Sequence, residues 1–210
     1  MSARRTLRVP AAATALALVG WFLTARLMDG MEMMDGPGPL ASFLWLWLAM
    51  SAAMMLPTVV PATYLAATVG RSGILFVLGY SAVWAATGLV AFEAARTLGG
   101  ADRWPAVAAV LVAAVYQLTP LKDACLRRCR SPLGSLFRLG SLRAGLEQGA
   151  FCLGCCWALM LALLALGIGS MFWMAVVAAV ILVEKVLPTG RQVSVAVAIG
   201  LVGAALWIVV

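Results

Sequence analysis

Long apolar runs, separated by short stretches of glycine, proline and charged residues, make up almost the whole chain. A helix that crosses a lipid bilayer needs about 20 mainly apolar residues. By this measure the pattern predicts about seven transmembrane helices, with expected bounds 9–28, 40–69, 73–97, 104–119, 143–167, 171–187 and 193–209. We therefore expect an all-α, polytopic membrane protein that forms a single integral membrane domain over residues 1–210.

The first apolar run follows Arg4 and Arg5, as it would in a signal peptide. It continues through Trp21 and Phe22 without a convincing cleavage site, so we interpret it as a retained first span.

Two prolines interrupt the second apolar run. Pro57 and Pro61 each remove a backbone hydrogen-bond donor, which predicts a kink or a break near the middle of this span. A broken helix at this depth is a frequent place for an ion site, whereas a simple kink serves packing alone.

Basic residues are distributed unequally between the two sides of the predicted helices. Twelve of the 15 Lys and Arg residues fall on one side, and Arg26, Arg96 and Arg103 fall on the other. The positive-inside rule then places the N-terminus in the cytoplasm and the C-terminus outside, in a bacterial inner membrane. The loop 28–39 is external and the basic loop 120–143 is cytosolic. The bases form no stripe interleaved with aromatic residues, so the expected partner is the lipid bilayer and not nucleic acid.

The composition excludes several classes of function. Hydrophobic residues make up 64% of the chain and charged residues 11%, which leaves no room for a separate soluble domain. There is no histidine, which rules out imidazole metal sites and histidine-based catalysis. Phosphate-binding loops and serine-hydrolase elbows are also missing from the sequence, so we do not expect an enzyme, although thiol redox activity stays open. The unusual chemistry is sulfur, with 5 Cys and 11 Met.

A stripe of sulfur is predicted on the fifth span. Cys152, Cys155, Cys156 and Met160 share one helical face near the middle of the membrane. Thiolate and thioether ligands favour Cu(I) and related soft ions, so the stripe indicates a soft-metal site. The alternative is that these cysteines are small, inert core residues.

Methionines on other segments are expected to converge on this stripe. They are Met50, Met54 and Met55 in the second span, Met171 and Met174 in the sixth, and Met31, Met33 and Met34 in the external loop beside Asp29, Glu32 and Asp35. Thioethers bind soft cations without deprotonation, and the acids would concentrate cations. The alternative is that the methionines of the two spans only fill gaps in the core, and that the loop is an ordinary solvated turn.

The cytosolic side carries a second sulfur pair and a polar position. If helical, Cys125 and Cys129 lie on one face among cations, which suits metal hand-off or thiol exchange. A basic amphipathic segment on lipid headgroups is the alternative. Glu184 should pair with a base or face an aqueous cavity, while Lys185 is expected to extend to the membrane interface.

Four motifs carry a resemblance to a known family. They are W-L-A-M-S-A-A-M-M-L-P at 47–57, P-L-K-x-x-C-L-x-x-C-R-x-P at 120–132, G-A-F-C-L-G-C-C-W-x-L-M at 149–160 and G-x-M-x-W-M at 169–174, followed by Glu184-Lys185. Together they resemble the bacterial family catalogued as predicted metal-binding integral membrane proteins, a domain of unknown function. The resemblance implies a helical membrane protein and points to the same sulfur positions. Some members carry His before the glycine of the third motif, where Gln148 stands here, which favours an all-sulfur site.

These observations favour an inner-membrane protein that binds, and passes on, a soft metal, most simply Cu(I). The expected partners are a metallochaperone or an assembly protein, and a homo-oligomer is compatible with the sequence. Two other hypotheses stay open, which are a membrane thiol or sulfur oxidoreductase and a non-catalytic scaffold subunit.

Overall fold

A computed structural model describes residues 3–29, 38–98, 103–131, 133–167, 170–187 and 190–209, and every regular element among them is an α-helix. The helices are α1 (Ala3–Asp29), α2 (Leu40–Thr68), α3 (Gly73–Leu98), α4 (Trp104–Gln117), α5 (Pro120–Arg130), α6 (Leu133–Arg138), α7 (Ser141–Gly167), α8 (Met171–Val186) and α9 (Gly190–Val209). The all-α prediction is confirmed, and each expected span has a helix within a few residues of its bounds.

Five of the described helices, α1, α2, α3, α7 and α9, are long and apolar enough to cross a membrane. The helices α4 and α5 would form a sixth span if they are taken as one segment bent by 68°. The remaining apolar helix, α8, has 16 residues, which is short for a simple crossing. The fold is thus compatible with a multi-pass membrane protein, while the count of seven spans and the orientation stay predictions.

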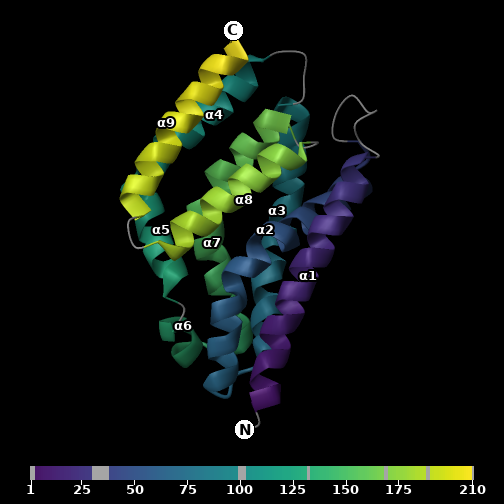
Figure 1. Cartoon of the computed structure of the whole chain (residues 1–210), viewed down its shortest axis with the longest axis vertical. Coiled ribbons are helices and arrows are strands. Elements are labelled where there is room, and N and C mark those ends of the chain that lie inside the picture. Colours follow the sequence, from purple (N-terminus) through teal and green to yellow (C-terminus); the bar gives the residue numbers. More distant parts are fainter. Residues whose placement is uncertain are drawn as a thin grey trace.

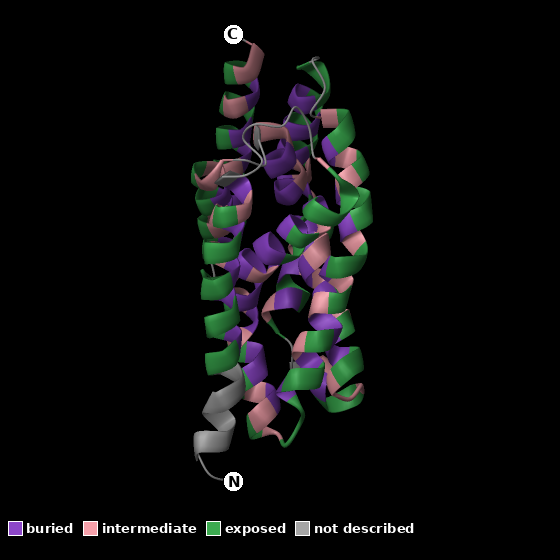
Figure 2. Ribbon diagram, turned by 90° about the vertical axis from the view of Figure 1, so that its right-hand side faces the viewer, coloured by how far each residue is buried: buried purple, intermediate pink, exposed green. Residues whose placement is uncertain are grey.

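Buried residues lie toward the middle of the bundle and exposed residues lie on its outside, as the purple and green ribbons of Figure 2 show. Many of the exposed side chains are large and apolar, including Trp45, Val90 and Trp207. An apolar outer surface of this kind is expected where lipid and not water is the solvent. The helix α1 begins and α9 ends at opposite ends of the molecule (Figure 1).

The helix α2 is continuous through both of its prolines, so the break that the sequence allowed is not present. In Figure 1 the helix instead changes direction part-way along its length, as a proline kink does. The hydroxyl of Thr58 donates to the carbonyl of Met55 at 2.7 Å, within the turn that precedes Pro61.

The basic loop 120–143, predicted to be cytosolic, contains two further helices that the span prediction did not include. The helix α5 begins at Pro120, and the hydroxyl of the preceding Thr119 accepts the backbone N–H of Lys122 at 3.3 Å. Proline at the first position and threonine as the N-cap are typical of a helix start. Three arginines lie in the last turn of α5, where their positive charge interacts favourably with the negative end of the helix dipole.

Glycines allow α3 and α7 to pack with their backbones in contact. A Cβ atom at Gly79 or Gly145 would collide with a backbone carbonyl of the opposite helix, that of Leu142 or Phe76. Small residues at such crossings are the usual route to close packing in membranes. The contact sets the rotation of α7, and therefore which of its faces meets α3.

We expect the Gly145→Ala variant to be less stable, because the added methyl group must push α3 and α7 apart at a cost of about 1–3 kcal/mol. Thermal denaturation in detergent should show a lower Tm. The matched control is Gly203→Ala on α9, where the new methyl group meets no atom within 4 Å. Equal Tm values for the two variants would contradict this account of the helix crossing.

Candidate metal centre

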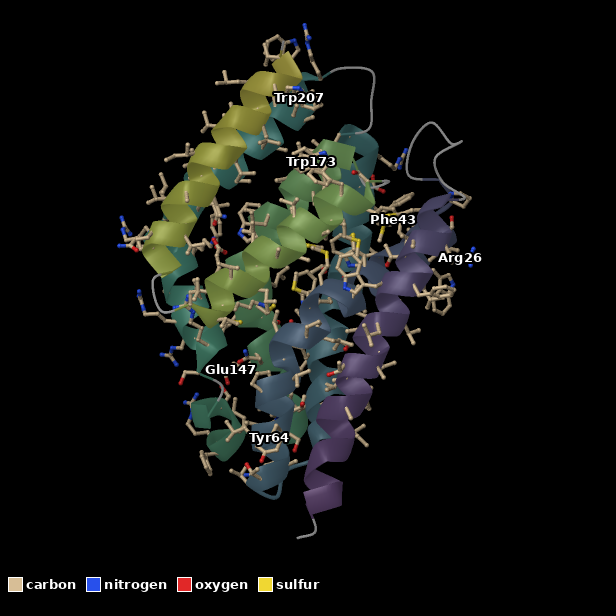
Figure 3. All side chains as sticks on the ribbon, viewed as in Figure 1. Arg26, Phe43, Tyr64, Glu147, Trp173 and Trp207 are labelled. Carbon is tan, nitrogen blue, oxygen red and sulfur yellow. The ribbon has the colours of Figure 1, made fainter. Side chains whose placement is uncertain are left out.

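The side chain of Cys152 is fully buried at a place where four helices meet. Its Sγ lies 2.9 Å from the hydroxyl of Tyr80 on α3, 3.0 Å from the Nζ of Lys185 on α8 and 3.9 Å from the Sδ of Met55 on α2. In Figure 3 yellow sulfur atoms gather in the middle of the molecule, where α2, α7 and α8 pass one another. A hydroxyl and an ammonium directed at one sulfur are the partners that stabilise a sulfur anion.

The other two cysteines of the stripe lie one turn further along α7. Cys155 and Cys156 are buried, and their sulfur atoms are 3.3 Å apart. The thiol of Cys155 donates to the backbone carbonyl of Cys152 at 3.2 Å. The predicted common face is therefore confirmed as a buried face of α7.

The helix α5 brings a fourth thiol to the same place. Cys129 lies within electrostatic interaction range of the Cys152 and Cys155 thiols, and only 8% of its surface is exposed. The amide of Gln148 donates to the Cys129 backbone carbonyl at 2.6 Å and contacts its Sγ at 3.6 Å. Gln148 thus lies in the wall of the thiol cluster.

Cys125 contacts α7 at a different point from Cys129. A Cβ atom at Gly154 would lie 2.7 Å from the Cys125 Sγ, so the missing side chain makes room for this thiol. The pair predicted on one face of α5 therefore spreads along α7, with Cys129 beside Cys152 and Cys125 beside Gly154. All five cysteines are free thiols.

Glu184 forms a buried ion pair. Its Oε1 lies 2.5 Å from the Nζ of Lys122, and both side chains are almost completely buried. The hydroxyl of Ser194 donates to the same oxygen at 3.3 Å. Of the two predicted environments for Glu184, the structure has the paired one.

The prediction for Lys185 is wrong. Its ammonium does not extend to the interface but turns inward, where it donates to the hydroxyl of Thr58 and to Cys152, each at 3.0 Å. Successive residues of a helix point about 100° apart. Because Glu184 faces α5 and α9, Lys185 faces α2 and α7. The last turn of α8 is held in place by Arg130, which donates to the carbonyls of Glu184 and Leu187.

A cavity of about 280 Å³ lies against the thiol cluster. Its polar lining comes from Thr58, Cys129, Arg130, Gln148 and Lys185, with Pro57 and Pro61 of α2 forming part of its apolar wall. The kinked part of α2, and not a helix break, thus borders the space beside Cys129.

The methionines predicted as metal ligands in the spans lie in or against the core, whereas those predicted in the loop are not described. The side chains of Met50, Met54, Met160 and Met174 are buried in the same core as the cysteines, and Met171 is half-buried against it. The structure records a sulfur–sulfur contact with Cys152 for Met55. The loop residues Met31, Met33 and Met34 lie outside the described residues.

Sequence reasoning missed Tyr80 and Thr58, and misplaced Lys185. The sequence did contain a signal that Lys185 turns inward, because a charged residue within an apolar membrane helix usually pairs with another group in the interior of the protein. Nothing in the sequence distinguished Tyr80 or Thr58 from ordinary helix residues.

One of the two short sulfur–sulfur distances in the cluster fits two ligands of the same soft metal ion, and the other does not. Among the described residues, no three His, Cys, Asp or Glu side chains are grouped so as to hold a metal ion. Two sulfurs bound to one ion at about 2.3 Å are separated by roughly 3.8–4.6 Å. The 3.9 Å between Cys152 and Met55 meets this requirement, whereas the 3.3 Å between Cys155 and Cys156 requires a side-chain rotation.

Comparison with known proteins assigns the chain to a family. The profile of the family PpoB2, described as a copper chaperone, matches residues 44–208. The chain belongs to the PpoB2 copper chaperone family. No curated protein and no solved structure matches the chain.

The PpoB2 match covers the whole candidate centre, from Met55 on α2 to Lys185 on α8. The family description names copper. It agrees with the prediction of a copper-related protein, which the sulfur-rich composition had suggested.

We expect Glu184→Gln to destabilise the protein strongly, because it leaves the buried Lys122 ammonium without a countercharge at a cost of about 3–5 kcal/mol. Thermal denaturation should show a marked fall in Tm. The double variant Lys122→Met/Glu184→Leu, which removes both charges, should recover most of the loss. If the single variant were as stable as the parent, Lys122 and Glu184 would not be the pair that joins α5 to α8.

Proposed function

We propose that this protein binds Cu(I) inside the membrane through sulfur ligands and passes it to a partner protein. The proposed primary ligands are Cys152, Cys155, Cys156 and Met55. The observation that carries the proposal is the Cys152 sulfur, which is buried next to Met55, accepts a hydrogen bond from Lys185 and is hydrogen-bonded to the hydroxyl of Tyr80.

The choice of Cu(I) over other forms of copper rests on the ligand chemistry. The candidate ligands are thiols and thioethers, and the chain has no histidine. Soft sulfur ligands favour Cu(I), whereas Cu(II) favours nitrogen and oxygen donors. The family description supports copper as the metal.

Lys185 and Tyr80 have a positioning role in this proposal. A thiolate is the form of cysteine that binds metal, and a bare anion in an apolar core is costly. The ammonium and the hydroxyl offset that cost before copper arrives. The copper ion then takes over the countercharge, and the lysine can turn toward the adjoining cavity.

The remaining sulfurs extend the site in two directions. Cys129 lies between the Cys152 cluster and the cavity, which suits a ligand that exchanges copper with a carrier. Met50, Met54 and Met174 belong to the same core along α2 and α8, and Met171 packs against it. A series of exchangeable sulfurs lowers the cost of moving a cation through an apolar interior.

We expect the triple variant Cys152→Ser/Cys155→Ser/Cys156→Ser to lose more than about a hundredfold in Cu(I) affinity, because serine replaces the soft donors with hard ones. Competition against a chromogenic Cu(I) chelator under reducing conditions measures the effect. The matched control is Ala165→Ser, which adds a hydroxyl to α7 without removing a thiol. A triple variant that retained the parent's affinity, or a parent that bound no Cu(I), would refute the proposal.

We expect Tyr80→Phe to weaken Cu(I) binding by about tenfold, as the loss of an outer-shell partner of a metal ligand does. The control is Tyr64→Phe on α2, a tyrosine whose side chain is exposed. The same chelator competition compares the two. Equal affinities would show that the hydroxyl of Tyr80 does not support the Cys152 ligand.

A further inference from the structure

The cavity beside the thiol cluster is lined by two cationic side chains. Arg130 and Lys185 both line it, and none of its lining residues is acidic. Two cations in a largely apolar wall repel each other and attract an anion more strongly than they would in water. The electrostatics of the cavity therefore favour a negatively charged occupant.

The two cations are fixed in place without being neutralised by a carboxylate. Arg130 donates to the backbone carbonyls of Glu184 and Leu187, and its buried Nε has no hydrogen-bond partner among the described residues. The nearby Glu184 carboxylate is already bound by Lys122 and Ser194. The hydrogen bonds of Arg130 thus go to backbone carbonyls, and no carboxylate in the described part of the chain neutralises its charge.

The neighbouring groups indicate the chemistry of that ligand. Carboxylates match guanidinium and ammonium donors well, and the Gln148 amide adds a polar group to the wall. Cys129 places a thiol in the same wall, beside Cys152. A cavity of about 280 Å³ is near the lower limit for small-ligand pockets, roughly 300 Å³, so it suits a small molecule and excludes a protein domain.

We propose that this cavity binds a small carboxylate-bearing thiol, and that copper reaches the cysteine cluster from such a carrier. The delivery of copper by this carrier rests on the proposed copper-binding function. In the exchange, the bond between Cu(I) and the carrier sulfur breaks as a bond to the Cys129 sulfur forms. The Cys129 proton passes to the released carrier thiolate, and copper stays monovalent throughout.

The binding test uses glutathione and S-methylglutathione, which has the same carboxylates but no free thiol. Calorimetric titration of the purified, reduced full-length protein in detergent should show that both bind. Val186 is 69% exposed at the cavity rim, so Val186→Asp adds a negative charge there without disturbing the core. We expect Val186→Asp to weaken both ligands about fivefold or more through like-charge repulsion.

The matched control is Ala179→Asp, which adds the same charge at an exposed position two turns earlier on α8, outside the cavity lining. It should leave binding unchanged, and Val186→Lys should not weaken it. Absence of binding by both peptides, or equal effects of the two aspartate variants, would overturn the proposal. So would inorganic phosphate binding as tightly as glutathione, because that result indicates a general anion site.

The copper test separates this inference from the proposed function. Excess S-methylglutathione should slow loading from a Cu(I)–glutathione mixture but not from a Cu(I)–2-mercaptoethanol mixture, since the second carrier has no carboxylate. If loading from both is equally unaffected, the carrier site is refuted while copper binding stands. If S-methylglutathione binds but no copper is taken up from either mixture, the delivery of copper is refuted, and only the binding of a carboxylate-bearing ligand in the cavity stands.

Discussion

The buried ion pair between Lys122 and Glu184 is the interaction on which the rest of the centre depends. Both charges are out of contact with solvent, so each would be very unfavourable without the other. The pair joins α5 to α8 at one fixed register. Because Cys129 lies two helical turns after Lys122, and Lys185 follows Glu184 directly, this register also places a thiol and an ammonium beside α7.

The thiol cluster combines groups that are individually costly in an apolar interior. A hydroxyl, an ammonium and several thiols are gathered around Cys152, and their mutual hydrogen bonds offset the loss of water. Such a cluster is stable only while each group keeps its partner. In the proposed function, an incoming soft cation offers Cys152 a stronger partner than the lysine, so copper can be exchanged without unfolding the site.

In the proposed function, the cavity defines one side of the centre for the exchange of copper. It meets the cluster at Cys129 and Lys185, on the side of the kinked α2 segment that contains Pro57 and Pro61. The methionine-rich core lies further along α2 and α8. A copper chaperone must both acquire and release its metal, and a centre with a cationic cavity on one flank and thioethers on the other has distinct surroundings for the two steps.

The all-helical class, the approximate bounds of the long helices and the shared face of Cys152, Cys155 and Cys156 could be predicted from the sequence, because each follows from residue type and helical periodicity within one segment. The partners of that face could not be predicted, because they depend on how the helices pack. Tyr80, Met55, Cys129 and Lys185 come from four other helices, and their approach depends on helix rotation and register. The glycine contact between α3 and α7 and the ion pair between α5 and α8 set those quantities, and neither contact is encoded in the periodicity of a single helix.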